Sequence, residues 1–519
     1  STNAGEMTFN HYGTIEVSSP TAPNAGNMGV FSDGYALANF YNNSKVYVGD
    51  DSVGIHTSRV DGFNYTFKNY GTLKIKIGAR STFAYLDGAA ITTLKEFFNQ
   101  GSAKVNIEAA MGTESSLVYA NNQADAVLDA DYTIDKGANN STIALLAANK
   151  SKVTVTAGKK LTTDTQVALA AVNGTSNPVV LGSGSSATNK GTIISTRTSD
   201  GIGIYTKDEG SNNTGGGSSN GVNEGSITMQ GKKAVGMYGK NVTTLENSLA
   251  TSSIKLENEE SVGMYGEIDA INTALPLVVK NNGNIELTKK KSVGIYLKNF
   301  STKTTNPKSD LTAENNKEIK MIGGEESIGI YAPQSKVSKV GKITMADAVK
   351  KSIATYISKG TTITDTASAE IALGTSGTNI AYYVKNKDTS LGTSADLGKV
   401  SGHGIGVYLT GINATTDKAV LPANAPEFNF KKGGGTNGDG IIGLYVKGAT
   451  DISAYTKTIT VGDRAGTDTN PINATGVYVE AQGTSSTPYE IKAKIRSGKN
   501  SVGIFSNPGA NKSYIKYTG

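Results

Sequence analysis

Ser292-Val293-Gly294-Ile295-Tyr296 is one copy of a short unit that recurs along the whole chain. Each copy has a small residue between two apolar ones, and in the later copies a Tyr follows. The copies are spaced by 24 to 37 residues, which is typical of stacked solenoid repeats. The repeat therefore predicts one continuous all-β solenoid over residues 1–519 with about 17 rungs. Its small position falls at Gly29, Gly54, Ala84, Val118, Ala144, Ala168, Gly203, Gly236, Gly263, Gly294, Gly329, Ala354, Ala381, Gly406, Gly443, Gly476 and Gly503.

A second apolar segment precedes each copy of the unit. In Gly283-Asn284-Ile285-Glu286-Leu287 the apolar and polar residues alternate, so one face of the predicted strand is buried and the other is exposed to solvent. Asn281 stands two residues before Gly283, and Asn-x-Gly favours a turn because both residues tolerate a left-handed backbone. Each repeat is therefore expected to contain a turn, an alternating strand and the small-residue strand.

The small position in the second strand has two explanations. If the two apolar residues of Val293-Gly294-Ile295 point inward, Gly294 points outward beside Tyr296, and a Tyr ring of the same or the next rung covers the bare backbone. Alternatively, the position is a tight corner at which a larger side chain would collide with the neighbouring rung. We favour the first explanation.

Charged pairs test the stacking directly. Five successive copies carry, four and three residues before the small position, pairs of alternating sign. In a parallel stack with rungs about 4.8 Å apart, each pair would face its opposite above and below. We interpret the pairs as an exposed charge ladder that contributes about 0–1 kcal/mol per pair. The pairs are Lys232-Lys233, Glu259-Glu260, Lys290-Lys291, Glu325-Glu326 and Lys350-Lys351.

Composition limits the function classes. The chain has 519 residues, 62 Gly and no Cys, which excludes a disulfide framework and thiol chemistry. No apolar stretch reaches the length of a membrane span. The net charge is +6, and only five of the 50 Lys and Arg residues are Arg, so we expect no nucleic-acid partner.

The repeat changes in character along the chain. Residues 1–175 hold degenerate rungs without the Tyr, whereas 176–519 hold regular rungs with it. Longer connections are expected at 207–222, 267–281, 298–316, 410–427, 430–440 and 462–473, and insertions in solenoids collect on particular faces. In the first six copies the Tyr position is assigned to Phe31, His56, Leu86, Ala120, Leu146 and Ala170.

Catalytic and metal motifs are not evident in the sequence. Of the histidines His11, His56 and His403, we expect His56 to stack in the position later held by Tyr. Residues 433–439 resemble one calcium-binding nonapeptide, but such sites need tandem copies. Carboxylates beside lysines stay ionised and make poor general acids. We therefore assign no catalytic, metal or cofactor-binding residue, expect no cofactor, and leave the ligand-binding residues unknown.

One repeated feature offers a binding surface. Ten successive copies, from Tyr205 to Tyr478, carry the Tyr, and Phe505 closes the series. Tyr rings present flat amphipathic surface on which sugars can stack. The alternative is that the rings stack on one another, and we favour it because a binding site rarely needs ten identical rungs.

The Ser-Val-Gly-Ile-Tyr copies, such as Ser261 to Tyr265, Ser292 to Tyr296 and Ser327 to Tyr331, resemble the passenger region of large fusobacterial type V autotransporter adhesins. The resemblance spans nearly all 519 residues and implies a right-handed parallel β-helix. It further implies export to the bacterial cell surface and anchoring in the outer membrane by a C-terminal β-barrel of the parent protein. Some members of the family are inhibited by galactose-type sugars and others by arginine. The repeat is structural, so no binding residue is carried over.

Three hypotheses follow for the function. The first is a non-enzymatic, monomeric adhesin fragment that binds a glycan or protein on host cells or other bacteria through its flank or inserted loops. The second is a β-helical polysaccharide lyase or hydrolase, which would need a carboxylate cluster unmatched by lysine. The third is a non-binding stalk that projects an adhesive tip lying elsewhere in the parent protein.

Overall fold

The computed structural model describes residues 7–519 except 22–25, 34–35, 60–64, 89–90, 94–98, 101–102, 174–183, 209–217, 270–275, 302–309, 387–388, 393–396, 431–439, 463–473, 481–482, 499–500 and 509–512. The chain forms two compact units. The first unit comprises Ser1–Asn258 with Thr273–Leu275, and the second comprises Glu259–Asn272 with Pro276–Gly519.

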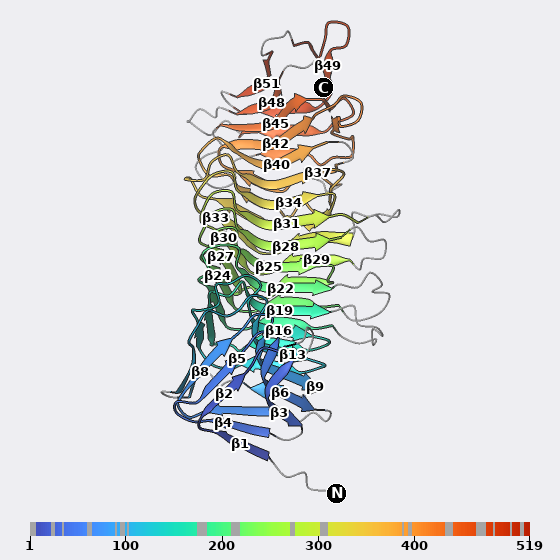
Figure 1. The fold of residues 1–519 in the computed structure, drawn as a ribbon. Coiled ribbons are helices and arrows are strands. Elements are labelled where there is room, and N and C mark those ends of the chain that lie inside the picture. Colours follow the sequence, from blue (N-terminus) through green and yellow to red (C-terminus); the bar gives the residue numbers. More distant parts are fainter. Residues whose placement is uncertain are drawn as a thin grey trace. The chain divides into compact units, whose positions relative to one another are not determined.

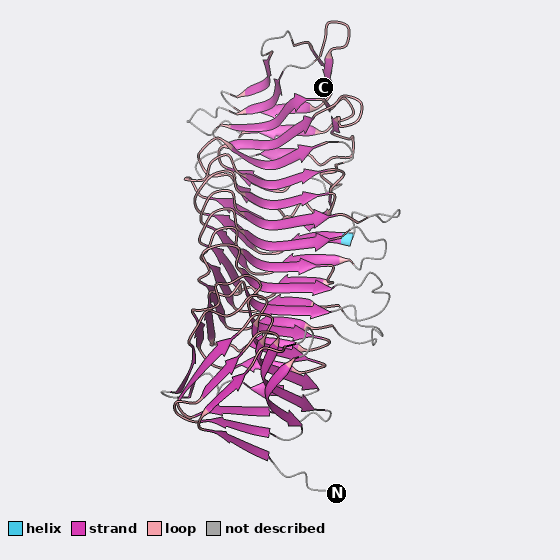
Figure 2. Cartoon of the chain, in the orientation of Figure 1, coloured by secondary structure: helices cyan, strands magenta, loops and turns pink. Residues whose placement is uncertain are grey.

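Each unit is a parallel β-solenoid with three strands in a regular turn (Figures 1 and 2). In the second unit the chain runs through β31 (Val293–Asn299), β32 (Leu311–Asn315) and β33 (Glu318–Met321) before the next turn repeats the order. Each of these strands pairs in parallel with the strand three places later. The predicted solenoid is confirmed, and its faces are called the tyrosine, second and third faces in the order of these three strands.

The tyrosine face carries the repeated unit. In the first unit it consists of β3 (Asn27–Asp33), β6 (Ser52–Arg59), β9 (Thr82–Gly88), β13 (Ser116–Asn121), β16 (Ile143–Ala148), β19 (Val167–Asn173), β22 (Ile202–Asp208) and β25 (Val235–Lys240). In the second unit it consists of β28 (Val262–Ile268), β31, β34 (Ile328–Pro333), β37 (Ile353–Ser358), β40 (Asn379–Lys385), β42 (Gly404–Gly411), β45 (Ile441–Gly448), β48 (Thr475–Glu480) and β51 (Val502–Asn507).

The second face has fewer strands. In the first unit these are β1 (Met7–His11), β4 (Ala36–Phe40), β7 (Tyr65–Asn69), β10 (Ile91–Thr93), β14 (Asp125–Leu128), β17 (Lys152–Val155), β20 (Ser186–Asn189), β23 (Asn220–Asn223) and β26 (Thr244–Asn247). In the second unit they are β29 (Leu277–Asn281), β32, β35 (Lys336–Lys339) and β38 (Thr362–Ile363). These 13 strands make about 13 complete turns, fewer than the 17 rungs predicted, because later turns lack a regular strand on this face.

The third face is divided into shorter sheets. In the first unit it holds β2 (Thr14–Val17), β5 (Lys45–Val48), β8 (Thr72–Ile77) and β12 (Ala103–Ile107), with β11 (Asn99–Gln100) antiparallel to β12, and then β15 (Tyr132–Ile134), β18 (Lys160–Thr163), β21 (Thr192–Ser195), β24 (Ser226–Met229) and β27 (Ser253–Leu256). In the second unit it holds β30 (Asn284–Leu287), β33, β36 (Lys342–Met345), β39 (Glu370–Ala372), β41 (Lys399–Ser401), β44 (Phe428–Phe430), β47 (Thr458–Val461) and β50 (Lys494–Ser497). Two small pairs complete the second unit: β43 (Ala419–Val420) with β46 (Thr450–Asp451), and β49 (Tyr489–Ile491) with β52 (Ile515–Tyr517).

The core of each unit consists of columns of aliphatic side chains. Ile285, Ile319 and Ile343 lie in register on β30, β33 and β36 and are fully buried. The neighbouring residues along these strands face solvent, so the predicted two-residue alternation is confirmed. Full burial of one such side chain contributes about 1.5–3 kcal/mol, and the column repeats this contribution in every turn.

The small position points into the core. Gly294 and Ile295 are both buried, whereas Val293 and Tyr296 are half-buried, so the alternation shifts by one residue at the glycine. A Cβ added to Gly294 would lie 2.6 Å from the carbonyl oxygen of Gly329 and 2.8 Å from Cγ2 of Ile319. The favoured explanation, in which Gly points outward beneath a Tyr ring, is therefore wrong. The tight corner is correct, because the strand bends here against the next rung.

The assigned register is wrong in two rungs of the first unit. The strand pairing aligns Ile55 with Ala84 and Ala84 with Val118, so Phe83 and Leu117, not Ala84 and Val118, occupy the small position. Tyr85 and Tyr119 therefore take the Tyr position in place of Leu86 and Ala120. Residues 1–175 therefore contain two rungs with Tyr at the Tyr position.

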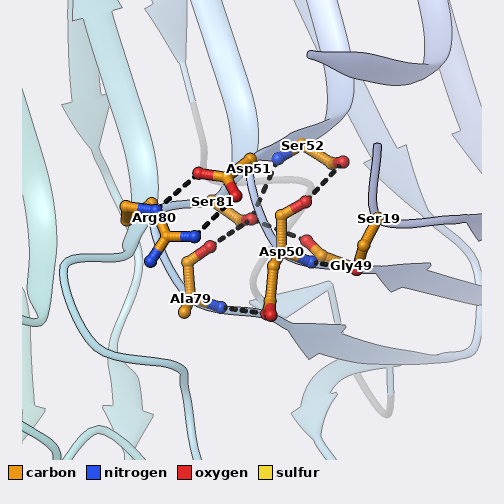
Figure 3. Close-up of polar contacts among 8 residues, drawn as sticks. All are labelled: Ser19, Gly49, Asp50, Asp51, Ser52, Ala79, Arg80 and Ser81. Carbon is orange, nitrogen blue, oxygen red and sulfur yellow. Dashed lines mark hydrogen bonds and ion pairs between the residues drawn. The ribbon is translucent and has the colours of Figure 1, made fainter. Parts of the chain in front are cut away.

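The corner before several tyrosine-face strands is built from a residue with positive φ followed by a buried Ser, as at Asp51-Ser52 and Arg80-Ser81. Figure 3 shows two such corners in the first unit, where Arg80 contacts both oxygens of Asp51, with Nε–Oδ1 2.5 Å and Nη2–Oδ2 2.6 Å. The backbone N–H of Ser52 donates to Oγ of Ser81 over 3.0 Å, and that hydroxyl donates to the carbonyl of Gly49 over 2.6 Å. Each corner is thus bonded to the next through both charge and hydroxyl.

The same corner carries the charge ladder in the second unit. Lys290 Nζ lies 3.5 Å from Glu259 Oε2, and the backbone N–H of Glu260 donates to the carbonyl of Lys290 over 3.1 Å. Lys351 Nζ likewise lies 3.5 Å from Glu325 Oε2. The prediction that these pairs occupy adjacent rungs is confirmed within this unit. Lys232 lies in the first unit, bridged to Ser199.

Buried asparagines bond the turns on the second face. Asn189 donates from Nδ2 to Oδ1 of Asn223, and Asn223 donates in the same way to Asn247, each over 2.8 Å. All three side chains are fully buried. Buried amide groups need hydrogen-bond partners, and in this column each Asn side chain is bonded to the Asn side chain of the neighbouring turn.

Candidate binding surface

Eight tyrosines and Phe505 form one continuous column on the tyrosine face of the second unit. Neighbouring ring centroids are 4.6 to 5.1 Å apart, with interplanar angles of 8° to 26°. The spacing matches that of paired strands, because each ring stands at the same register position as the next. The tyrosines are Tyr265, Tyr296, Tyr331, Tyr356, Tyr383, Tyr408, Tyr445 and Tyr478.

The stacking decides what this column offers to a ligand. Each inner ring is covered on both faces by its neighbours, so ring edges and hydroxyl groups are what reaches solvent. Sugars stack on ring faces. Phe505 ends the column and is 45% exposed. The interpretation that the rings stack on one another is confirmed, whereas their expected role of covering the glycines is not.

An aliphatic column lies beside the rings. The residue three positions before each Tyr is half-buried and β-branched in most rungs, as at Val262, Val293 and Ile328. These residues share the outward side with the Tyr because of the bend at the small position. The tyrosine face of the second unit therefore presents a strip of aliphatic side chains and phenol edges.

A charged column borders the rings on their other side. Tyr445 donates its hydroxyl hydrogen to the carboxylate of Glu480, and Lys447 Nζ lies 2.9 Å from Glu480 Oε1. These hydrogen bonds from Tyr445 and Lys447 lower the pKa of Glu480. Burial and the neighbouring carboxylate raise the pKa of Tyr445. At neutral pH a protonated phenol therefore faces an ionised carboxylate.

Other carboxylates are paired with lysines in the same way. Lys342 Nζ lies 3.2 Å from Glu318 Oε1, and Lys399 Nζ lies 3.3 Å from Glu370 Oε1. Burial alone would raise the pKa of Glu318, but hydrogen bonds from Thr344 and Lys342 outweigh it, so the pKa is lowered. A carboxylate held ionised in this way cannot serve as a general acid near neutral pH.

The first unit has a second stack of tyrosines that the repeat did not reveal. The ring centroids of Tyr12 and Tyr41 are 4.2 Å apart, and those of Tyr41 and Tyr70 are 5.1 Å apart. Tyr12 is 65% exposed and Tyr70 49%. The sequence does contain a signal, because Tyr12-Gly13-Thr14 and Tyr70-Gly71-Thr72 are equivalent copies of the turn that begins the third face.

His56 takes part in an aromatic column, as expected. Its ring lies edge-to-face with Phe31 at 5.2 Å and with Tyr85 at 4.8 Å. Burial lowers its pKa, although the charge of Asp87 opposes the shift. His11 contacts the carbonyl of Lys45 through Nε2 at 3.1 Å, and His403 lies in the second unit.

In each unit, some connections from a tyrosine-face strand to the next second-face strand are long in sequence. Of these, 174–183, 209–217, 270–275 and 302–309 separate consecutive strands of these two faces. Other rungs make the same connection with a short turn, as between β25 and β26. Of the other expected connections, 430–440 and 462–473 fall almost entirely on 431–439 and 463–473, which lie outside the described residues and precede β45 and β48 in the chain.

Buried carboxylates stand where two of these connections begin or end. Asp208 accepts hydrogen bonds from Ser218 Oγ over 2.6 Å and from the backbone N–H of Ser219 over 3.1 Å. Asp310 accepts from Ser301 Oγ over 2.5 Å. Both Asp side chains are almost fully buried. The residues on either side of 209–217 are therefore hydrogen-bonded to each other, and so are those on either side of 302–309.

Within the described ranges, no three His, Cys, Asp or Glu side chains gather as metal ligands. The nonapeptide-like segment 433–439 lies outside the described residues. No described helix is long and apolar enough to cross a membrane.

Comparisons with protein-family models, with curated proteins and with solved structures find no match to this chain.

Proposed function

We propose that this chain is the passenger segment of a bacterial cell-surface adhesin, which attaches to a glycan or protein on host cells or on other bacteria. The observation that carries the proposal is that long connections recur, in each unit, between a tyrosine-face strand and the next second-face strand. Solenoids with binding functions carry their per-repeat insertions on one face. The resemblance of the repeated unit to fusobacterial autotransporter passengers supports export and attachment to the outer membrane through the parent protein.

The pairing of carboxylates weighs against the lyase or hydrolase alternative. A glycosidase needs one carboxyl group with a raised pKa beside a second carboxylate. Glu318 and Glu480 have lowered pKa values and lysine partners. Burial does raise the pKa of Asp125, Asp164 and Asp208, but Asp125 is paired with Lys152, and Asp208 accepts hydrogen bonds from Ser218 and Ser219. These groups fit a non-catalytic surface better than an acid–base site.

One observation favours the stalk alternative. The rings of the tyrosine column bury one another's faces, so the most regular aromatic feature strengthens the solenoid and does not offer platforms for sugars. If the binding element lies elsewhere in the parent protein, this segment would serve as a rigid spacer.

The test uses the whole 519-residue chain with partner bacteria and host epithelial cells. Saturable binding that is lost to galactose, N-acetylgalactosamine or arginine supports the adhesin and identifies the ligand class. Two variants locate the site: one shortens 209–217 and 302–309, and a matched control shortens 431–439, which precedes β45. Loss of binding in the first variant alone is expected. Absence of binding by a correctly folded chain would support the stalk.

A further inference from the structure

Tyr445 and Tyr478 are the closest ring pair in the tyrosine column of the second unit. Their centroids are 4.6 Å apart with an interplanar angle of 8°. β45 and β48 pair in parallel with Tyr445 opposite Tyr478, so the two rings face each other across 33 residues of sequence. The stacked rings are therefore held next to each other by the strand pairing.

The pair also has a proton acceptor in place. Oxidation of a phenol by one electron releases its hydroxyl proton, and a basic group within hydrogen-bond reach assists such a transfer. Tyr445 already donates that proton in a hydrogen bond to Glu480. Lys447, at 2.9 Å from Glu480, keeps the carboxylate ionised and ready to accept it.

The position of the pair limits the coupling partners of Tyr478, whereas Tyr445 also stacks on Tyr408 at 4.9 Å. Beyond Tyr478 the column ends with Phe505, whose centroid is 5.1 Å from that of Tyr478. A Phe ring cannot form a phenoxyl radical, so Tyr478 has Tyr445 as its sole tyrosine neighbour in this column. Both rings are half-buried, and Asn507 donates to the hydroxyl of Tyr478 over 3.0 Å at an exposed position. A small oxidant therefore reaches their edges from solvent.

We propose that Tyr445 and Tyr478 form an oxidative cross-linking site, at which hydrogen peroxide and a haem peroxidase convert the stacked pair into dityrosine. Each phenol loses one electron and its hydroxyl proton, and the proton of Tyr445 passes to Glu480 and then to water. The two radicals form a carbon–carbon bond between their ortho positions. The two ortho hydrogens then move to the oxygens and restore both phenols. Peroxide accepts the two electrons and two protons and becomes two water molecules.

The product would covalently join two turns of the solenoid. The inference is independent of which ligand, if any, the chain binds. It requires the parallel stack, because the two residues lie far apart in sequence and the solenoid brings them together.

One competing pair must be removed before the test. Tyr12 and Tyr41 are 4.2 Å apart, and Tyr12 is 65% exposed while Tyr41 is half-buried, so this pair would compete for oxidation. In the full chain, Tyr41→Phe keeps a ring between Tyr12 and Tyr70 but removes the phenol through which either of them could couple in that stack. This background leaves the column of the second unit unchanged.

The experiment treats the Tyr41→Phe chain with peroxide and a haem peroxidase and maps dityrosine by fluorescence and peptide mass spectrometry. The expected result is an intrachain bridge between the peptides that carry Tyr445 and Tyr478, with a higher unfolding temperature. Tyr478→Phe should abolish this bridge. Glu480→Gln should reduce its yield several-fold while preserving the circular dichroism spectrum. Tyr296→Phe, a matched change in the same column, should leave the bridge intact.

Three results would overturn the proposal. These are the absence of the Tyr445–Tyr478 bridge, an even spread of bridges over all ring pairs of the column, and a yield that does not change in Glu480→Gln. Mixing isotopically labelled and unlabelled chains separates intrachain from interchain bridges, and purely interchain products would also contradict it.

Discussion

Gly294 lies directly beneath the carbonyl oxygen of Gly329 in the next turn, at a distance that leaves no room for a side chain. A Cβ at Gly294 would stand 2.6 Å from that oxygen. The close approach results from the bend that turns both Gly294 and Ile295 toward the core. The short distance between neighbouring turns therefore requires glycine at this position.

Replacement of Gly294 by Val should destabilise the second unit. The added branches would collide with the Gly329 carbonyl and with Ile319, and overpacking of this kind costs about 1–3 kcal/mol. Thermal and urea unfolding followed by circular dichroism measure the change. Gly503→Val is the matched control, since its Cβ would have no neighbour closer than Ile495 at 3.9 Å. Equal effects of the two changes would refute the steric explanation.

The asparagine column predicts that a single substitution strongly lowers the free energy of unfolding. Asn223→Ala removes the acceptor for Asn189 and the donor to Asn247, and so leaves buried amide groups unpaired. A cost of about 1–3 kcal/mol in the free energy of unfolding is expected. Asn27→Ala, which removes an exposed hydrogen bond to Ser18, should cost much less. The two variants are compared by urea denaturation.

The charge ladder predicts a small, salt-sensitive effect. Lys290→Glu places like charges in adjacent turns beside Glu259, so we expect a loss below about 1 kcal/mol that diminishes as salt is added. The double variant Glu259→Lys with Lys290→Glu should recover part of the loss. A double-mutant cycle at low and high salt gives the coupling. A loss that is independent of salt would indicate a steric cause.

Alkaline pH should weaken the first unit through Tyr85. Burial raises the pKa of Tyr85 from 10.0 to about 12. Because the folded state holds the proton more tightly than the unfolded state, the stabilising contribution is complete below the unfolded pKa and is lost as pH rises toward the folded value. Phenolate absorbance at increasing pH should show Tyr85 ionising late. The difference should disappear in Tyr85→Phe, and a Tyr85 that titrates near 10.0 would contradict the burial argument.

Periodicity alone was sufficient to predict the parallel solenoid. The spacing of the small residues and the alternation in strands such as β33 reflect the same backbone repeat, so the class of fold and the opposed charges of Glu259 and Lys290 were predictable. The sequence leaves the pairing register of a strand ambiguous where two small or apolar residues are adjacent. At Phe83-Ala84 the sequence favours the smaller residue, whereas the strand pairing places Phe83 at the small position.

The direction of side chains was harder to predict than their spacing. A strand with regular alternation would put Gly294 and Tyr296 on one side, but the bend shifts the alternation and only the neighbouring turn reveals it. The Tyr12, Tyr41 and Tyr70 stack was missed because its three copies precede a different strand from the repeated unit. Ligand-binding residues stayed unassigned, since the repeated positions proved to be used in packing.

The alternating charges at the corner of the second unit have a consequence for folding. Glu260, Lys291, Glu326 and Lys351 occupy equivalent positive-φ positions in successive turns. Turns of such similar sequence could pair out of order, as repeats with weak register do. A displacement by one turn would set like charges against each other, whereas a displacement by two turns would restore the attraction. The charges at this corner therefore disfavour a displacement of the stack by an odd number of turns. A displacement by an even number of turns must be prevented by the unequal lengths of the connections.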